Sequence, residues 1–559
     1  MTATSHQQSV SGSSADSFDI VVIGAGYAGL YALHYYRKLG YRVRLYDKAG
    51  GVGGTWYWNR YPGARVDIES MEYSYSFSED IQQNWQWSER YASQPELMRY
   101  LNWVADRLEL RPDIQLNSEM KTARYDEAAD RWHLGLSTGE SVATRFLVLA
   151  TGILSAAKDP QFKNRERFKG AVYFTSSWPH DPVSFKGKRV AVIGTGSSGI
   201  QSIPEIAKEA AHLTVFQRSA NFAVPSCNRP MEPEFERWVK DNYLEIRERE
   251  LRTHVGCAIV GNEIRANPTK ATFEVSEEER LEAFERCWNA ANFSYYTVFT
   301  DILTDKRAND ALGDFIRDRI RAQVKDPKVA ELLTPHDHPV LTRRLCAENG
   351  YYLTYNRDNV LLVDISKSGI DEFTEKGLKA GGKEYEFDII VCATGFDAMT
   401  GSIMRMDIHG RGGRQMSREW AEKGARTRAG MMSEGYPNLF MLNGPTSPAA
   451  FFQPVLLGEW QTRWFGRLMR RMDQRGFTAV EPTVEAENEW IQHNIEVADH
   501  TLFPLAKSWY MGDNVPGKPR VILSYLGGFS LYRSTLEASE DNKYTGFKLE
   551  RAKLSQAAE

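Results

Sequence analysis

The sequence is poor in cysteine, lacks long hydrophobic runs and carries an almost balanced charge. Its 559 residues include five cysteines, which lie far apart and never form a C-x-x-C pair. This spacing excludes a disulfide framework, a zinc knuckle and a dithiol redox centre, and it favours the reducing cytoplasm. No apolar stretch approaches the ~18 residues of a membrane-spanning helix. With a net charge of −4, the composition indicates neither a membrane partner nor a nucleic-acid partner.

Motifs of several hydrolases and metalloenzymes are also missing. Neither the G-x-S-x-G nucleophile elbow nor the H-E-x-x-H zinc motif occurs. The segment from His336 to His338 lacks a third nearby ligand and precedes a proline, so we expect a surface loop and no metal there. Residues 1–17 are polar and have no apolar core, so we expect a disordered tail rather than a secretion signal.

Two segments with G-x-G-x-x-G spacing are the most informative feature that the sequence does have. Each follows a short apolar run and precedes a helix-like stretch. In such a turn the first glycine permits the tight bend, the second lets a pyrophosphate approach the backbone, and the third lets helix and strand pack closely. Two such turns in one chain predict two bound dinucleotides, a flavin and a nicotinamide. The glycines are Gly24, Gly26 and Gly29 in the first turn and Gly194, Gly196 and Gly199 in the second.

The residue that ends the second strand of each unit indicates which cofactor binds where. Asp47 follows the segment 41–46 after the first turn, and an acid there suits an unphosphorylated ribose, as in FAD. Arg218, with Ser219 beside it, ends the corresponding segment after the second turn. A base there suits a 2′-phosphate, so NADPH is favoured over NADH. The alternatives are an ordinary surface acid and an ordinary surface base.

The chain is too long for one hydrophobic core, so several domains are expected. We predict an α/β fold with two Rossmann-like dinucleotide-binding domains and a helical insertion. Charge-rich helical stretches at 233–252 and 276–289 mark the insertion, and a strand at 436–444 marks the return to the first domain. The predicted boundaries are 18–150 and 390–559 for the FAD domain, 151–225 and 335–389 for the NADP domain, and 226–334 for the insertion.

The segment between the two glycine turns resembles the identifying sequence of flavoprotein Baeyer–Villiger monooxygenases, F-x-G-x-x-x-H-x-x-x-W-P. Phe168, Gly170, Trp178 and Pro179 match it, whereas Phe174 stands where the family has histidine. Further segments at 53–65, 393–397 and 514–518 resemble the same family, most closely its phenylacetone- and cyclohexanone-type enzymes.

The resemblance implies an NADPH- and O2-dependent, FAD-containing monooxygenase that converts ketones to esters or lactones. It also implies that the reaction passes through a peroxide on the flavin C4a carbon, with the flavin carrying the chemistry. In the family, the histidine replaced by Phe174 is thought to couple NADPH binding to catalysis. Phenylalanine keeps the volume but loses the imidazole hydrogen bonds, so slower or altered coupling is expected. A nearly inactive protein is the alternative.

The resemblance assigns the central roles to a few polar side chains. Arg344 is the expected catalytic arginine, because a guanidinium is a permanent positive charge that stabilises developing negative charge. Asp67 is expected to pair with Arg344, since a carboxylate matches the guanidinium, and to reach the nicotinamide amide. Arg343 is expected at the NADP 2′-phosphate beside Arg218. Trp509 is expected to hydrogen-bond NADP and to close a lid.

The remaining expected contacts follow from the turns and the resemblance. The ketone pocket is assigned to the loop 446–453, whose two phenylalanines predict apolar ketones, with core packing as the alternative. Residues expected at this pocket are Ala449, Ala450, Phe451 and Phe452. Further cofactor contacts are expected from Thr55, Trp56, Tyr73, Thr195, Ser197, Ser198 and Ser219, in addition to the glycines and Asp67.

Two other functions stay open at this stage. An N- or S-oxygenating flavin monooxygenase shares both glycine turns and a similar linker. A non-catalytic flavin-binding protein is the alternative of a different class, motivated by Phe174. The expected partners are a small ketone and O2, and the oligomeric state is left open, with a monomer as one option.

Overall fold

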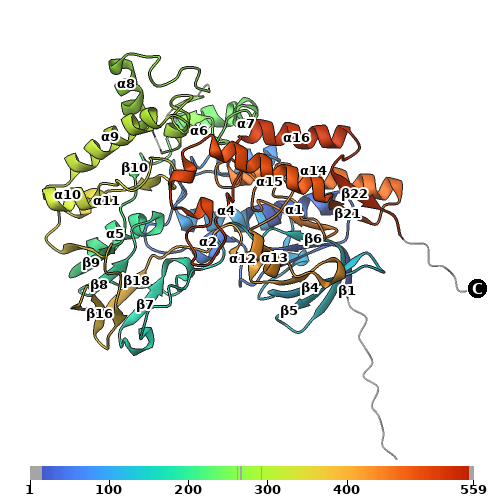
Figure 1. Ribbon diagram of the computed structural model, residues 1–559, viewed down its shortest axis with the longest axis horizontal. Coiled ribbons are helices and arrows are strands. Elements are labelled where there is room, and N and C mark those ends of the chain that lie inside the picture. Colours follow the sequence, from blue (N-terminus) through green and yellow to red (C-terminus); the bar gives the residue numbers. More distant parts are fainter. Residues whose placement is uncertain (1–15, 261, 265–266, 291, 553–559) are drawn as a thin grey trace, which may run out of the picture.

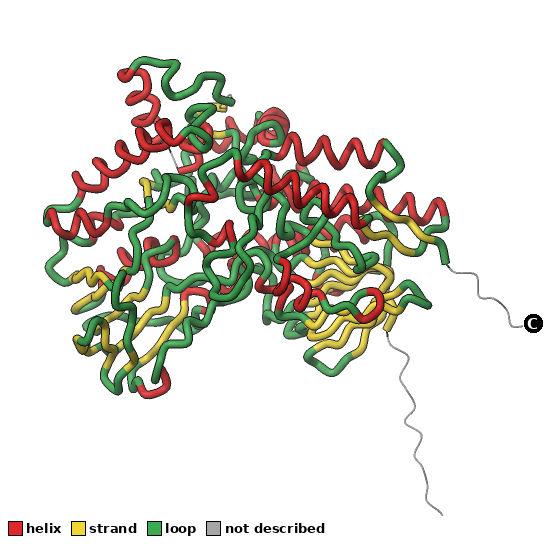
Figure 2. Tube along the Cα trace, in the orientation of Figure 1, coloured by secondary structure: helices red, strands yellow, loops and turns green. Residues whose placement is uncertain are grey.

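The computed structural model describes residues 16–552, apart from residues 261, 265, 266 and 291. The fold is built around two large β-sheets, which lie at the lower left and lower right of Figure 1, and helices lie above them. Figure 2 shows the strands gathered in these two places. The predicted α/β class is confirmed. The expected tail at residues 1–17 lies outside the described residues, except that Asp16 and Ser17 already belong to the first strand.

The first sheet is built around β1, which pairs in parallel with β2 and β6. The apolar run of β1 from Ile20 to Ile23 is buried, as expected for a strand covered on both faces. Antiparallel pairing adds β5 to β6 and β4 to β5, and the strand order is β19-β4-β5-β6-β1-β2-β3 with β20 beside β6. The strands are β1 (Asp16–Ile23), β2 (Val43–Tyr46), β3 (Ile114–Gln115), β4 (Met120–Asp126), β5 (Arg131–Leu136), β6 (Ser141–Leu149), β19 (Asp407–His409) and β20 (Leu439–Met441).

The C-terminal part of the chain returns to this first sheet. The strand expected at 436–444 is shorter than predicted, because Asn438 and Asn443 on either side of β20 have φ of 58° and 56° and turn the backbone away. Next to the sheet, α14 packs against α1, and Gly466 of α14 leaves the space that the ring of Tyr35 fills. The helices of this part are α1 (Tyr27–Lys38), α3 (Glu79–Asn84), α4 (Gln94–Arg107), α12 (Gly401–Met404), α13 (Met416–Lys423), α14 (Pro454–Arg475), α15 (Val484–Asp499) and α16 (Phe529–Asp541).

The second sheet is all parallel in the order β14-β9-β8-β18-β7. Helix α5 follows β8 directly, and a small antiparallel sheet of β15, β16 and β17 lies between β14 and β18 in the sequence. The elements are β7 (Ala171–Phe174), β8 (Arg189–Ile193), α5 (Ser197–Glu209), β9 (His212–Gln217), α11 (Tyr351–Thr354), β14 (Val360–Asp364), β15 (Glu372–Phe373), β16 (Gly377–Ala380), β17 (Lys383–Glu386) and β18 (Ile389–Cys392).

Helices dominate the segment 226–334, at the upper left of Figure 1. The single helix expected at 233–252 is wrong, because the backbone leaves helical geometry at Asn242, with φ −112° and ψ 12°. The helix expected at 276–289 begins at Glu277, where Ser276 forms a capping box with Glu279. The helices are α6 (Pro233–Asp241), α7 (Tyr243–Glu250), α8 (Glu277–Trp288), α9 (Lys306–Gln323) and α10 (Pro327–Leu333). The division into domains stays a prediction.

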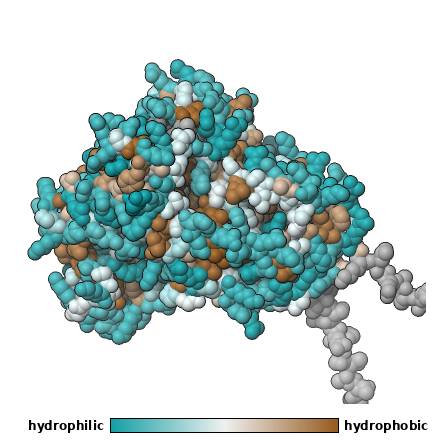
Figure 3. Space-filling view, turned by 45° about the horizontal axis from the view of Figure 1, so that its top comes forward, coloured by the Kyte–Doolittle hydropathy of each residue, from teal (hydrophilic) through white to brown (hydrophobic). Residues whose placement is uncertain are grey.

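Shorter strand pairs complete the described chain. They are β10 (Ala223–Pro225) with β13 (Cys346–Glu348), β11 (Ile259–Val260) with β12 (Glu263–Ile264), and β21 (Ala479–Pro482) with β22 (Phe547–Glu550). One hydrophobic cluster contains Val21 of β1 and Val192 of β8, so packing is continuous between the regions of the two large sheets. The face drawn in Figure 3 is mostly hydrophilic, with hydrophobic residues in small groups. Among the described helices, none combines the length and apolarity that crossing a bilayer requires.

A buried charged cluster attaches α7 to the first part of the chain. Arg247 donates hydrogen bonds to the carbonyl oxygens of Met71 and Glu72, both at 3.0 Å, and forms a 3.0 Å ion pair with Glu250. The Glu72 carboxylate in turn accepts the backbone N–H of Ala258 at 2.5 Å. The carboxyl groups of Glu72 and Glu250 are both buried and interact with each other, and burial raises the pKa of Glu72 and raises the pKa of Glu250 to about 7.

Substituting Glu250→Gln should remove part of the pH dependence of stability. In the folded protein Glu250 keeps its proton up to about pH 7, whereas an unfolded glutamate loses it near pH 4.3. The folded state therefore binds more protons in this window, and its stability falls as pH rises through it, by at most about 1.4 kcal/mol per pH unit. Thermal midpoints at pH 5 and pH 7 measure the slope. The exposed Glu245→Gln is the control, and a wild-type slope in E250Q would contradict the assignment.

Candidate active site

Arg344 and Asp67 form an ion pair, although they are 277 positions apart in the chain. The Asp67 Oδ2 atom accepts from Nε of Arg344 at 2.9 Å and lies 2.8 Å from Nη2. Nη1 donates to the carbonyl oxygen of Ala450 at 3.2 Å. Burial opposes the charge of the guanidinium, but the Asp67 carboxylate keeps the pKa of Arg344 above its usual value. Arg344 is therefore a fixed cation with directed donors, and the pairing expected with Asp67 is present.

The loop expected to hold the ketone divides between two surroundings. Ala450 contacts Arg344 through its carbonyl, and the ring of Phe451 lies 4.6 Å from that of Tyr510 and 5.0 Å from that of Phe503. The ring of Phe452 is instead stacked on Phe529 at 4.2 Å in a buried cluster. Both rings are buried in hydrophobic clusters, as the alternative of core packing expects, but Phe451 also contacts Tyr510, which interacts with Arg344. Ala449 is buried in the same cluster as Phe452.

The first glycine turn is closed by the segment that begins with Gly53. Gly24 has φ +114°, and a Cβ atom there would lie 2.4 Å from the carbonyl oxygen of Ala150, so only glycine fits. The backbone N–H of Gly53 donates to the carbonyl of Ala25 at 2.9 Å, which brings Gly54 against Gly26. Helix α1 begins after Gly26 with no side chain capping it, so its N-terminal N–H groups can bind phosphate.

The other residues expected at the flavin lie around this turn. A short helix, α2 (Thr55–Trp58), carries two of them. The indole N–H of Trp56 donates to the Tyr73 hydroxyl at 3.3 Å, which joins two of the expected contacts. The Asp47 carboxylate accepts the backbone N–H groups of Ala25 at 2.6 Å and Ala49 at 2.8 Å. Because a carboxylate has about four lone-pair sites, Asp47 can also accept from a ribose.

The second glycine turn repeats the design with one difference. Gly194 has φ +110°, and a Cβ atom there would lie 2.4 Å from the carbonyl oxygen of Ala393. A Cβ at Gly199 would lie 2.3 Å from the carbonyl oxygen of Gly194. At Gly196, however, a Cβ would meet no atom within 4 Å, and α5 begins there without a side-chain cap. The turn therefore leaves open space and free N–H groups, which fit a pyrophosphate.

The polar residues of the second turn connect it to Arg344. The Ser197 hydroxyl lies 3.1 Å from Sγ of Cys346, which is two residues after Arg344. The Thr195 hydroxyl donates to the carbonyl oxygen of Ser219 at 3.0 Å, and the Ser198 hydroxyl lies 3.1 Å from that of Thr175. The structure thus brings the second glycine turn close to the segment that contains Arg344, and Cys346 is a contact that the sequence analysis missed.

Two lysines that the sequence analysis also missed lie near the expected 2′-phosphate end. Arg218 is exposed. Burial lowers the pKa of Lys158, and the positive charge of Arg218 lowers it further. Two neighbouring cations suit a phosphate. Nζ of Lys158 donates to the carbonyl oxygen of Asn514 at 2.6 Å, and Lys518 pairs with Asp397 at 2.9 Å. Both lysines therefore fasten the segment that follows Trp509.

Arg343 has partners different from those of Arg344. It donates from Nε to the carbonyl oxygen of Lys507 at 3.0 Å and pairs with Asp337 at 2.9 Å. Its expected contact with the 2′-phosphate stays a prediction. The surface loop expected at 336–338 is correct for the exposed His336 but wrong for His338, which is 4% exposed and bonded to Asp337 at 2.7 Å.

Phe174 ends β7, the edge strand of the second sheet, and its backbone neighbour across the sheet is Cys392. The guanidinium of Arg165 lies 5.4 Å from the centre of its ring. The next residue, Thr175, contacts Ser198 of the second glycine turn. Phe174 thus immediately precedes a residue that contacts the turn, and the effect of the replacement on coupling stays a prediction.

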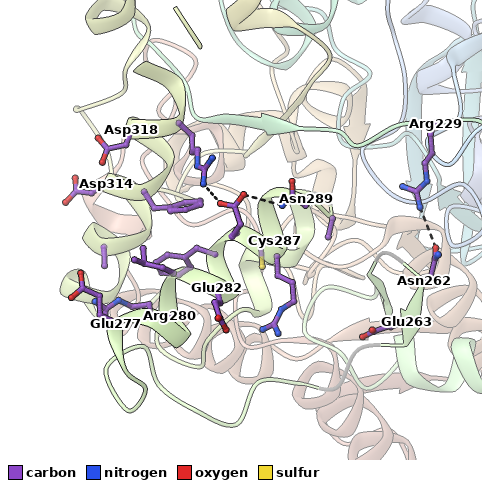
Figure 4. A pocket seen from close by; sticks show the side chains of 18 residues that line it. Arg229, Asn262, Glu263, Glu277, Arg280, Glu282, Cys287, Asn289, Asp314 and Asp318 are labelled. Atoms are coloured by element: carbon purple, nitrogen blue, oxygen red, sulfur yellow. Dashed lines mark hydrogen bonds and ion pairs between the residues drawn. The ribbon is translucent and has the colours of Figure 1, made fainter. Parts of the chain in front are cut away.

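A wide groove of about 1450 Å³ lies away from these residues, between α8, α9 and the segment around Asn262 (Figure 4). Its rim carries charges of both signs, with Arg319 paired to Glu285 and Arg229 bonded to Asn262 at 3.5 Å. None of the predicted site residues lines it. The candidate site is therefore the region around Arg344 and Asp67. Ser197 and Cys346 connect it to the second turn, and Tyr73, which is near both charges, accepts a hydrogen bond from Tyr27 just after the first turn at 3.3 Å.

Comparisons with known proteins agree with this geometry. The family model described as pyridine nucleotide-disulphide oxidoreductase matches residues 18–289, which hold both glycine turns, although all five cysteines here are free. A Baeyer–Villiger monooxygenase of Pseudooceanicola batsensis is 43% identical over 94% of this chain and 95% of its own. The phenazine N-monooxygenase PhzNO1 of Lysobacter antibioticus is 42% identical over 95% of this chain and 97% of its own.

The same agreement holds in three dimensions. The solved structure of OTEMO in complex with FAD and NADP is 39% identical, covers 96% of this chain and 100% of its own, and has a TM-score of 0.91. Likeness of this order extends over nearly the whole length, which includes both glycine turns. The chain therefore belongs to the flavoprotein Baeyer–Villiger monooxygenase family.

Proposed function

We propose that this protein uses FAD, NADPH and O2 to insert an oxygen atom beside the carbonyl of apolar ketones, giving esters or lactones. The observation that carries the proposal is the buried Arg344–Asp67 ion pair, whose segment Cys346 connects to the second glycine turn through Ser197. When bound, FAD supplies the activation of oxygen and NADPH supplies the electrons. The protein itself supplies charge, position and exclusion of water.

Each role of the chain follows from a contact already described. The Arg344 guanidinium stays charged at every working pH, so it stabilises negative charge that develops on oxygen during the reaction. Asp67 and the Ala450 carbonyl hold it from two sides and limit its motion. The first turn with Asp47 would hold FAD, and the second turn with Arg218 and Lys158 would hold NADPH.

The preference for apolar ketones rests on the ring cluster beside Arg344. Phe451, Phe503 and Tyr510 pack together, and each is less than one-tenth exposed. These rings exclude water and carry no charge themselves, and Arg344 beside them is already paired with Asp67, so a charged substrate finds no unneutralised partner there. Pure apolar contact does not distinguish linear, aryl and cyclic ketones strongly.

A panel of ketones tests this proposal directly. The purified protein should show a bound flavin, oxidise NADPH faster in the presence of a linear alkanone, acetophenone or cyclohexanone, and release the corresponding ester or lactone. A charged ketone such as pyruvate should stimulate oxidation least. Mass spectrometry of the products is the measurement. Reaction with charged ketones alone would contradict the apolar preference, and NADPH oxidation that no ketone accelerates would contradict the activity itself.

N-oxygenation is a second candidate, because one relative at 42% identity is a phenazine N-monooxygenase. A phenazine and a thioether in the same panel separate the two functions. Formation of an N-oxide with no ester from any ketone would favour the second candidate. We also propose that the protein works in the reducing cytoplasm, since all five cysteines are free thiols.

A further inference from the structure

The hydroxyl of Tyr510 lies next to Arg344 and is completely enclosed. Tyr510 belongs to a short 3-10 helix, Trp509–Met511, and its side chain is 0% exposed. Its ring lies 4.6 Å from that of Phe451 and 4.0 Å from that of Trp509, and its carbonyl accepts the N–H of Leu523 at 2.8 Å. Ring and backbone are therefore fixed, and the hydroxyl cannot turn toward solvent.

This hydroxyl has a hydrogen-bond donor that the described residues leave unused. Its oxygen interacts electrostatically with Arg344, but it makes no hydrogen bond of ordinary geometry with another described residue. A guanidinium offers donors and no acceptor, so Arg344 can engage only the lone pairs of Tyr510 and never its proton. A buried donor without an acceptor is costly in folded proteins, and at this place beside Arg344 a molecule that is not part of the chain can supply the acceptor.

We propose that Tyr510 Oη donates a hydrogen bond to the carbonyl oxygen of the ketone, beside the donors of Arg344. This inference rests on the proposed function, and it adds a second, neutral donor to a site in which Arg344 is the permanent cation. The position of the ring against Phe451 places the hydroxyl at the loop assigned to the ketone, not at either glycine turn. Tyr510 thereby becomes a catalytic residue that selects substrates with a carbonyl oxygen.

The hydroxyl is suited to this role over the whole working pH range. Burial raises the pKa of Tyr510 above its usual value, so the group stays protonated and remains a donor. Tyr296 is also buried and also interacts with Arg344 and with the backbone at Leu345. The two tyrosines differ in their neighbours, since the ring of Tyr510 lies against Phe451 of the loop assigned to the ketone.

Tyr510→Phe removes only the hydroxyl, and two substrates reveal what the hydroxyl did. With a ketone that the wild type converts, kcat/KM should fall by about 10- to 100-fold, less than for a lone oxyanion donor because Arg344 remains. With a thioether, which has no carbonyl oxygen, the rate of sulfoxidation should stay within about twofold of the wild type. The rate of flavin reduction by NADPH and the Kd of NADP+ should not change.

A binding measurement checks the contact without turnover. In the oxidised protein, the carbonyl stretch of a bound carbon-13-labelled ketone should lie at lower frequency in the wild type than in Tyr510→Phe, because a hydrogen bond weakens the C=O bond. Tyr36→Phe is the matched control, since its hydroxyl is equally buried and makes no hydrogen bond of ordinary geometry, but it lies in the last turn of α1.

The outcomes separate this inference from the proposed function. If the wild type forms no ester from any ketone, the proposed function fails before the variant is tested. If the wild type is active and Tyr510→Phe converts the ketone normally, the inference is wrong. It is equally wrong if ketone and thioether oxidation fall together, or if NADP+ binding weakens while the ketone stretch stays in place.

Discussion

Replacing Arg344 with alanine should abolish ester formation while flavin reduction by NADPH continues nearly unchanged. Arg344 is a cation held by Asp67 at 2.9 Å and by the Ala450 carbonyl at 3.2 Å, and it lies beside the apolar loop. Losing a single oxyanion donor typically lowers a rate by about 10²–10³-fold, and here a full positive charge is lost as well. Rapid-mixing absorbance follows flavin reduction, and product analysis follows the ester.

A lysine at the same position separates charge from geometry. Arg344→Lys keeps one positive charge, but an ammonium cannot reach Asp67 and the Ala450 carbonyl with the same fork of donors. We expect partial activity, between that of the wild type and that of Arg344→Ala. The exposed Arg357→Ala is the control for removing a charge elsewhere. Ester formation by Arg344→Ala at a nearly normal rate would mean that the cation beside Asp67 takes no part in oxygenation.

The parts of the site that the sequence predicted are those that local spacing determines. A G-x-G-x-x-G turn is a local structure, and the close carbonyl contacts of Gly24 and Gly194 show why glycine is needed there. The ion pair between Arg344 and Asp67 joins residues 277 positions apart, so it came from the family resemblance and not from any spacing rule.

The contacts that were missed depend on tertiary packing and carry no sequence pattern. Tyr510 is one tyrosine of 26, and only the fold shows that it faces Arg344 while Trp509 next to it stays partly exposed. Lys158 and Cys346 are single residues whose partners, Asn514 and Ser197, lie more than a hundred positions away. The break between α6 and α7 was missed for a different reason, because nothing in the residue types around Asn242 forbids a continuous helix.

Gly196→Ala should leave the fold and the bound flavin intact but weaken NADPH binding by about 10²-fold or more. The backbone at Gly196 has φ −85° and ψ −171°, which alanine adopts without strain, and a Cβ atom there would meet no atom of the protein within 4 Å. The fold does not need glycine at this position, whereas an approaching pyrophosphate does. Isothermal titration with NADP+ measures the loss, which corresponds to about 2.7 kcal/mol for each hundredfold.

Two further glycine variants make the test specific. Gly26→Ala is the equivalent change in the first turn, where a Cβ would lie 3.4 Å from Gly54 Cα, and it should lower the retained FAD instead of the NADPH affinity. Gly194→Ala should destabilise the protein itself, because the residue has φ +110° and its Cβ would lie 2.4 Å from the Ala393 carbonyl. This division separates glycines that the chain requires from glycines that a ligand requires.

If Gly196→Ala bound NADP+ as tightly as the wild type, or if it lost FAD instead, the assignment of the second turn to the nicotinamide cofactor would be wrong.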